Sequence, residues 1–165
     1  NTGRVVLYEI TGDDGVSKSI DLLGNQAGSQ FGWAVSFSKS GNRIAISAPY
    51  FNTNGFVNAG LVRLFEFDGE TWDQVGFDLH GENNDELFGF SVSMSGNGNT
   101  IVVGSTGGVN RLGKVSVFTL YGYEWEQVGE SVHGQSFGDA FGQAVAIDYD
   151  GQRIGATSFS HNVKR

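Results

Sequence analysis

The chain has 165 residues, of which 39% are hydrophobic and none is cysteine, so it can bury a sizeable core but cannot form a disulfide or a cysteine zinc site. Ten basic residues against eighteen acidic ones give a formal charge of −8, and the basic residues are scattered. Because nucleic-acid binding needs concentrated Lys and Arg, we expect no nucleic-acid partner. No apolar run approaches the roughly 20 residues of a membrane helix, so we expect no membrane insertion.

A repeat organises the whole chain into three consecutive copies, residues 3–59, 60–112 and 113–165. Each copy carries a G-x-V pattern, then F-G, then G-x-x-I at fixed offsets. The glycines that open the copies, Gly3, Gly60 and Gly113, are followed 28 residues later by Phe31, Phe88 and Phe141. This regularity predicts an architecture built by stacking one small unit, in which most prominent residues are framework. Residues 1–165 are therefore interpreted as one repeat domain.

The first half of each copy predicts a β-hairpin. Apolar residues alternate along its first strand, at Val5 and Leu7, Val62 and Leu64, and Val115 and Val117. Period two indicates a strand with one buried face. A turn at Gly69 or Gly122 then leads into a second strand that opens with Trp72 or Trp125.

The second half of each copy begins at the Phe-Gly pair and predicts two further strands. The alternating apolar positions of the third strand, expected in the core, are Val35 and Phe37, Val92 and Met94, and Val145 and Ile147. A short turn leads into a fourth strand rich in small residues, such as RIAISA at 43–48. Four antiparallel strands every 53 to 57 residues is the period of a propeller blade. The sequence thus predicts an all-β protein of three four-stranded antiparallel β-propeller blades, as a partial propeller or part of a larger one.

The sequence FGWAVSFSKSGNRIAISAP at 31–49, with GLVRLFEF at 60–67, resembles the FG-GAP repeat of integrin alpha-chain-type β-propellers. The resemblance covers the whole chain as three repeats, although Pro49 has no counterpart in the second and third copies. It implies propeller blades and a secreted or cell-surface location. It does not imply one function, because such repeats occur in adhesion receptors, secreted enzymes and uncharacterised surface proteins alike. The turn SKSGN is also similar to the S-P-D-G turn of WD40-like propellers, which is the structural alternative.

Members of the FG-GAP family often hold calcium between the third and fourth strands, through carboxylates in a D-x-D-x-D-G pattern. Only the third copy keeps two of these carboxylates, Asp148 and Asp150, beside Gly151. These two residues are the candidate calcium ligands. A plain turn in which Asp caps the backbone is the alternative that we favour, and no other cofactor is expected.

Trp33 is the candidate contact residue for a partner, because the other copies have Phe90 and Gln143 at its position. By contrast, five aromatic residues recur at equivalent positions and are expected to form the structural core of the repeat: Phe31, Phe88, Phe141, Trp72 and Trp125. His80 and His133 share one offset and are interpreted as structural as well.

The acidic stretch GENNDELFG at 81–89 brings Glu82, Asp85 and Glu86 together on one loop. We expect a solvated loop here, with a bound cation or a basic partner as the alternative.

The stretch GQSFG at 134–138 has G-x-S-x-G spacing, but no run of helical period is present to make it a strand-to-helix elbow. No acid and histidine recur with a serine, so we expect a protein without catalytic activity. The predicted function is a structural or binding module of a secreted or surface protein, which recognises a protein or glycan partner through propeller loops. One alternative is a set of blades from a propeller hydrolase or lyase whose catalytic residues lie outside this chain. Another is a subunit of an extracellular fibre or coat assembled through open blade edges.

The repeat frame leaves half-blades at both ends of the chain, and unpaired strand edges invite pairing with another strand. We therefore expect the chain to be part of a longer propeller. Its partners at these edges would be other blades of the parent chain or neighbouring copies.

Overall fold

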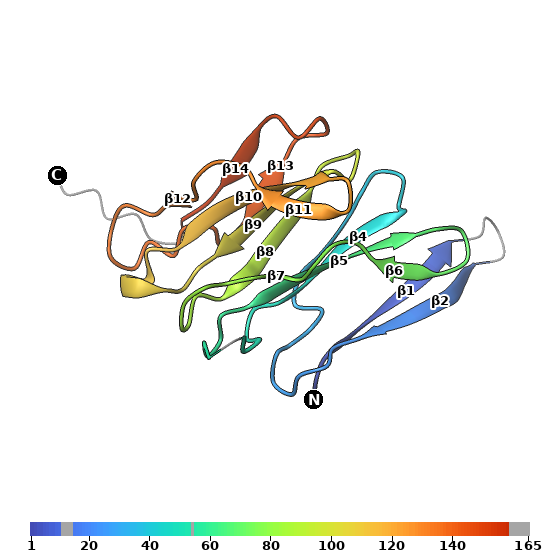
Figure 1. Cartoon of the computed structure of the whole chain (residues 1–165), viewed down its shortest axis with the longest axis horizontal. Helices are drawn as coiled ribbons and strands as arrows, with labels where there is room; N and C mark the ends of the chain where they lie inside the picture. The colour runs from blue at the N-terminus through green and yellow to red at the C-terminus, as the bar shows by residue number, and fades with distance from the viewer. Residues whose placement is uncertain (11–14, 54, 159–165) are drawn as a thin grey trace.

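The computed structural model describes residues 1–10, 15–53 and 55–158. The described residues form β-strands joined by turns, with one short 3-10 helix, η2 (Val109–Arg111). The sheets follow one another in chain order along the long axis of the molecule (Figure 1). The predicted all-β class with antiparallel sheets is confirmed.

Four antiparallel sheets are formed by the described strands. The N-terminal hairpin sheet contains β1 (Arg4–Ile10) and β2 (Val16–Leu23). The first five-stranded sheet contains β3 (Val35–Phe37), β4 (Arg43–Ala48), β5 (Leu61–Phe67), β6 (Trp72–Gln74) and β7 (Leu79–His80). The second five-stranded sheet contains β8 (Phe88–Met94), β9 (Thr100–Ser105), β10 (Lys114–Tyr121), β11 (Glu124–Gln127) and β12 (Val132–His133). The C-terminal hairpin sheet contains β13 (Val145–Ile147) and β14 (Ile154–Ala156).

The sheets are offset from the sequence copies by two strands. β4, from the first copy, pairs along its whole length with β5, from the second, and β9 pairs with β10 in the same way. Each five-stranded sheet therefore takes its strands from two copies. Instead of three four-stranded units there are two larger sheets flanked by two hairpins, and the described strands do not close into a ring.

A glycine and a phenylalanine meet at the same place in all three copies. The contacts are the parallel bridges Gly3–Phe31, Gly60–Phe88 and Gly113–Phe141. The three glycines have φ of 81°, 90° and 73°, and a Cβ at each would lie 2.2 Å from the carbonyl oxygen of the bridged phenylalanine. Only glycine tolerates both this backbone conformation and this approach. The 28-residue spacing thus reflects a backbone contact between the two residues. We call the end of each sheet at which these bridges lie its glycine–phenylalanine end.

Two hydrophobic cores lie between successive sheets. The core between the N-terminal hairpin sheet and the first five-stranded sheet contains Leu7, Leu22, Phe31, Ile44, Ile46, Ala48 and Leu61. The core between the two five-stranded sheets contains Ala45, Val62, Leu64, Phe88, Met94, Ile101, Val103 and Trp125. Successive residues of β4 face opposite cores, as the period of a strand requires. At β4, the first five-stranded sheet is therefore covered by apolar packing on both faces.

The framework aromatics differ in how deeply they are buried. Phe31 and Phe88 are buried, whereas Phe141 is half-buried. Trp125 is buried and donates its Nε1–H to the Val75 carbonyl oxygen at 3.2 Å, which ties β11 to the preceding sheet. Trp72 is half-buried and stacks on Phe67, with 5.4 Å between ring centroids.

The expectation that Val35 and Phe37 are core residues is wrong, since their exposed fractions are 48% and 47%. Their counterparts on β8, Val92 and Met94, pack into the core between the two five-stranded sheets. On the corresponding side of β3, a cavity of about 230 Å³ lies between β1 and Phe37. No strand among the described residues covers this side of β3 as the first five-stranded sheet covers β8.

Candidate functional site

Three polar residues stand in one row across the second five-stranded sheet, at its glycine–phenylalanine end. Lys114 on β10 pairs directly with Ser105 on β9 and with His133 on β12. Residues directly opposite each other on neighbouring strands project to the same face of a sheet. The ammonium, hydroxyl and imidazole groups are therefore presented to one side.

Glu86 faces this row from the loop between β7 and β8, and only 3% of its surface is exposed. The backbone turns at the two flanking residues, Asp85 and Leu87, which have φ of 53° and 56°. The Oε2 atom of Glu86 accepts hydrogen bonds from the Glu82 backbone N–H (3.1 Å) and from the side-chain amide of Asn83 (2.8 Å). Its Oε1 atom lies 2.9 Å from Nζ of Lys114. The buried carboxylate is thus held by hydrogen bonds within its own loop, and its charge is neutralised by Lys114 from the next copy.

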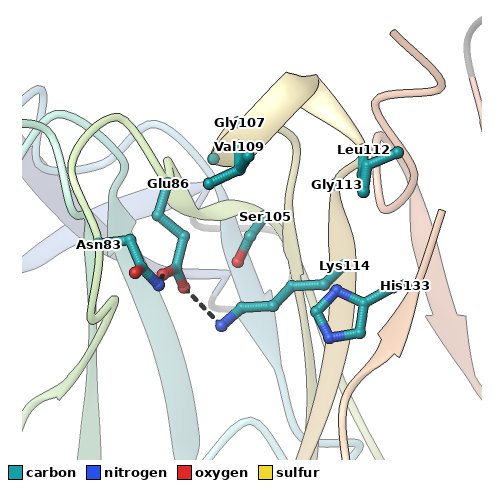
Figure 2. Close-up of a pocket in the computed structure, with 10 residues that line it drawn as sticks. Asn83, Glu86, Ser105, Gly107, Val109, Leu112, Gly113, Lys114 and His133 are labelled. Carbon is teal, nitrogen blue, oxygen red and sulfur yellow. Dashed lines mark hydrogen bonds and ion pairs between the residues drawn. The ribbon is translucent and has the colours of Figure 1, made fainter. Parts of the chain in front are cut away.

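These groups line a cavity of about 260 Å³. Asn83 and Glu86 form one wall, the segment that carries Val109 and Leu112 forms another, and His133 stands beside the stem of Lys114 (Figure 2). The Ser105 hydroxyl points into the space beside the Glu86–Lys114 ion pair. Ser105 is 1% exposed, and its Oγ atom makes no hydrogen bond with any described residue. A buried hydroxyl without a partner loses its hydration without compensation, so a ligand that reaches this atom would supply a missing hydrogen bond.

The arrangement offers polar groups to a ligand, and no described base is hydrogen-bonded to the Ser105 hydroxyl. Ser105 and His133 belong to strands on opposite sides of β10, so their backbones are separated by about 9 to 10 Å. A serine nucleophile needs its base within hydrogen-bond reach, about 3 Å, and Ser105 Oγ has no hydrogen bond to His133 or to any other described residue. Lys114, between them, is already paired with Glu86.

Glu86 contradicts the expectation of a fully solvated acidic loop. Glu82 and Asp85 are exposed as expected, but Glu86 is buried. Asp139 occupies the equivalent place in the third copy, where its Oδ2 atom accepts hydrogen bonds from the backbone N–H groups of Gln135 and Ser136, both at 2.8 Å. An acid at this position therefore holds the loop in two copies, and the contact with Lys114 distinguishes Glu86.

Trp33 lies outside this cavity, at the start of the first five-stranded sheet, with 45% of its surface exposed. Its Nε1–H donates to the Phe90 carbonyl oxygen at 3.0 Å. Its ring lies 5.4 Å from the ring of Phe90 and 6.0 Å from that of Tyr50. Trp33 thus links the two five-stranded sheets while part of its surface remains accessible.

Asp148 caps a turn. Its Oδ1 atom accepts hydrogen bonds from the backbone N–H groups of Gln152 (2.7 Å) and Arg153 (3.0 Å). The bond from Arg153, followed by that from Gln152, lowers the pKa of Asp148. In the other copies, Ser38 and Ser95 accept the equivalent bond. Asp150 is exposed, and no group of three His, Asp or Glu side chains within the described ranges is placed to hold a metal ion.

Sequence reasoning named Glu86 and His133 separately, but it missed Ser105, Lys114 and the cavity that brings the four together. The available clue was a departure from the repeat. The first copy has Ala48 where the second has Ser105, and Leu61 stands in the position of Lys114.

No known protein family matches the chain, and no curated protein matches it. In the part of the chain that the structure describes, no helix combines the length and the apolar character needed to span a membrane.

Proposed function

We propose that the chain is a non-enzymatic binding module, which recognises its partner through the cavity formed by Asn83, Glu86, Ser105, Lys114 and His133. The observation that carries this proposal is the buried hydroxyl of Ser105, which has no partner among the described residues and lies beside a buried ion pair. Buried polar groups cost stability unless they are fully paired. A bound ligand would supply the missing partner of this set.

The sheets provide a rigid support for such a cavity, because its polar residues lie on strands or are tied to the backbone by hydrogen bonds. We propose further that the sheets are blades of an FG-GAP-type propeller in a secreted or cell-surface protein. The glycine–phenylalanine bridge that recurs in each copy supports this assignment, because it gives the motif a fixed structural role.

The binding proposal is tested by ligand-observed NMR with a mixed library of neutral sugars, charged sugars, amino acids and nucleosides. The comparison protein carries Glu86→Ser, Ser105→Ala and Lys114→Leu, which introduce the residues found one repeat earlier at Ser29, Ala48 and Leu61. At least one compound is expected to bind the wild-type chain and to lose its binding in this triple variant. Binding that the triple variant retains, or a complete lack of binding to the wild type, contradicts the proposal.

A role in assembly is the second candidate, because Val35 and Phe37 leave one side of β3 uncovered. The contact that would cover it already occurs twice in the chain. The backbone N–H of Met94 donates to Ser36 Oγ (3.0 Å), and that of Ile147 donates to Ser93 Oγ (3.2 Å). Each bond joins the opening strand of one sheet to the opening strand of the next.

A second copy of the chain is the occupant that this repetition favours. On β13, Ala146 stands at the position of Ser36 and Ser93, so the outer side of the C-terminal hairpin sheet is equivalent to the side that β3 offers to β8. Packing it against Val35 and Phe37 of another copy would repeat the internal contact head to tail. Contacts of this kind close into rings or grow into fibres.

Sedimentation velocity tests the assembly role. The wild-type chain is expected to associate as its concentration rises, and Phe37→Lys is expected to remain monomeric. Phe77→Lys, which changes an exposed phenylalanine elsewhere, should associate like the wild type. A wild-type chain that stays at 17.7 kDa across the concentration range rules out this second role.

A further inference from the structure

We infer that the ligand of the cavity at Glu86 and Lys114 is a neutral, hydroxyl-rich molecule of about the size of one sugar ring, such as a single unit of a glycan. This inference rests on the proposed binding function and specifies the chemistry of the ligand. Three features of the cavity carry it: its charge balance, its hydrogen-bonding capacity, and its size and walls.

The charge balance disfavours an ionic ligand. Glu86 and Lys114 neutralise each other at 2.9 Å, and the Glu86 side chain is only 4% exposed. A ligand carboxylate would compete with Glu86 for Lys114, and a ligand ammonium would compete with Lys114 for Glu86. Either would leave a buried charge without its counterion, which is strongly unfavourable. A neutral ligand leaves the ion pair intact.

The hydrogen-bonding groups match hydroxyls. A lysine ammonium has three N–H donors, and the serine hydroxyl can both donate and accept. The Lys114 ammonium is paired with Glu86, and Ser105 Oγ has no partner among the described residues. A ligand hydroxyl can accept from Lys114 while it exchanges a hydrogen bond with Ser105. Adjacent hydroxyls on one ring could engage both groups together.

The size and walls suit a single ring. Pockets for drug-sized ligands are typically about 300 to 1,000 Å³, and this cavity of about 260 Å³ lies just below that range. Val109, Leu112 and the His133 ring supply apolar or flat surfaces around the polar floor. Gly107 and Gly108 line the cavity without side chains. The C–H face of a sugar ring can rest on such walls while its hydroxyls point to Ser105 and Lys114.

The test is saturation-transfer NMR with individual probes: glucose, galactose, mannose, fucose and N-acetylglucosamine as neutral sugars, and glucuronic acid and glucosamine as charged ones. At least one neutral sugar is expected to bind. Its affinity should be at least tenfold greater than that of glucuronic acid and glucosamine. Ser105→Ala is expected to weaken this binding at least tenfold, and the triple variant with Glu86→Ser and Lys114→Leu added should abolish it.

Lys39→Leu is the matched control, because it removes a lysine from the turn at the opposite end of the sheets and should leave binding unchanged. Circular dichroism establishes that each variant is folded. If a charged sugar or a non-sugar library compound binds at Ser105 and Lys114 in place of the neutral sugars, the ligand class is wrong while the binding function stands. If nothing binds there, both are wrong.

Discussion

The two five-stranded sheets have the same strand pairing at the glycine–phenylalanine end but differ in side-chain packing there. This end is filled by apolar side chains in the first sheet and contains a cavity in the second. In the first sheet, Leu61 and Ala48 pair with each other and are buried in a hydrophobic core. In the second sheet, Lys114 and Ser105 form the same pair and line a cavity. Phe51 packs against the core of the first sheet, and Gly108 occupies its position in the second copy.

The difference teaches that a repeat can keep its backbone geometry while a few side chains change what that geometry does. Full burial of a leucine such as Leu61 contributes about 1.5 to 3 kcal/mol to the free energy of unfolding. The second sheet lacks this contribution, because Lys114 stands in the position of Leu61. In its place the second sheet has an ion pair, a buried hydroxyl without a partner among the described residues, and a cavity. If the cavity binds a ligand as proposed, stability is lower at the site of function, a pattern expected of functional sites.

The largest effect on stability is expected at the phenylalanines that occupy the equivalent bridged position in each copy. Phe88→Ala and Phe31→Ala should each lower the free energy of unfolding by about 3 to 5 kcal/mol, because each removes a buried ring and leaves a cavity. Phe141→Ala should cost less, because Phe141 is half-buried. Urea denaturation measures the three values. A change within about 0.5 kcal/mol for Phe88→Ala, as for a surface residue, would be incompatible with its place in the core.

The ion pair gives the next largest effect. Lys114→Ala leaves the buried Glu86 carboxylate without its counterion and should lower the free energy of unfolding by about 3 kcal/mol. Arg153→Ala is the control, because its contact with Asp148 is exposed and 3.5 Å long. Removing such a pair should cost at most about 1 kcal/mol. Equal losses in the two variants would mean that the Glu86–Lys114 pair is not buried in solution.

Introducing the apolar residues of the first sheet at the glycine–phenylalanine end of the second tests whether the two ends differ only in their side chains. The triple variant with Glu86→Ser, Ser105→Ala and Lys114→Leu should be more stable than the wild type by about 1 to 3 kcal/mol, because it replaces a buried ion pair with apolar packing. Thermal and urea unfolding measure the gain. A marked loss of stability would show that the side chains at this end of the first sheet cannot replace those of the second, and that the cavity residues have a structural role.

The smallest effect is expected in the turn of Asp148, where the copies again differ in one side chain. Asp148→Ser restores the residue of the other two copies and should leave stability at pH 7 nearly unchanged. The pKa of Asp148 is lowered in the folded state, so the carboxylate stabilises the fold above its ordinary pKa near 4. That contribution is lost as the pH falls through the lowered folded pKa, and the serine variant should lack this step in acid titrations.

Calcium provides the matching measurement for the same turn. Adding calcium to chelator-treated protein should leave the melting temperature unchanged, because the Oδ1 atom of Asp148 is already bonded to two backbone amides. Binding at one hundred times the dissociation constant would add about 2.7 kcal/mol. A rise of several degrees that Asp148→Ser abolishes would identify a calcium site instead.

Much of the framework followed from local patterns in the sequence. The alternation of Val62 and Leu64 predicted a strand with a buried face, and the turns at Gly69 and Gly122 are β-hairpin turns between paired strands. The constant spacing from Gly60 to Phe88 indicated a fixed element of the repeat, and the two residues form a backbone bridge. These features depend on the backbone preferences of a few neighbouring residues, so one copy of the repeat carries the information for them.

Only the tertiary structure decided which surfaces are covered and which polar groups meet. Phe37 and Met94 occupy equivalent positions in the repeat, yet Phe37 is exposed because no described strand covers its side of β3. Glu86 and Lys114 belong to different copies and are brought together by the pairing of strands across the copy boundary. Burial and charge pairing depend on neighbours distant in the chain, so a periodic sequence determines the shape of each unit but not the environment of each side chain.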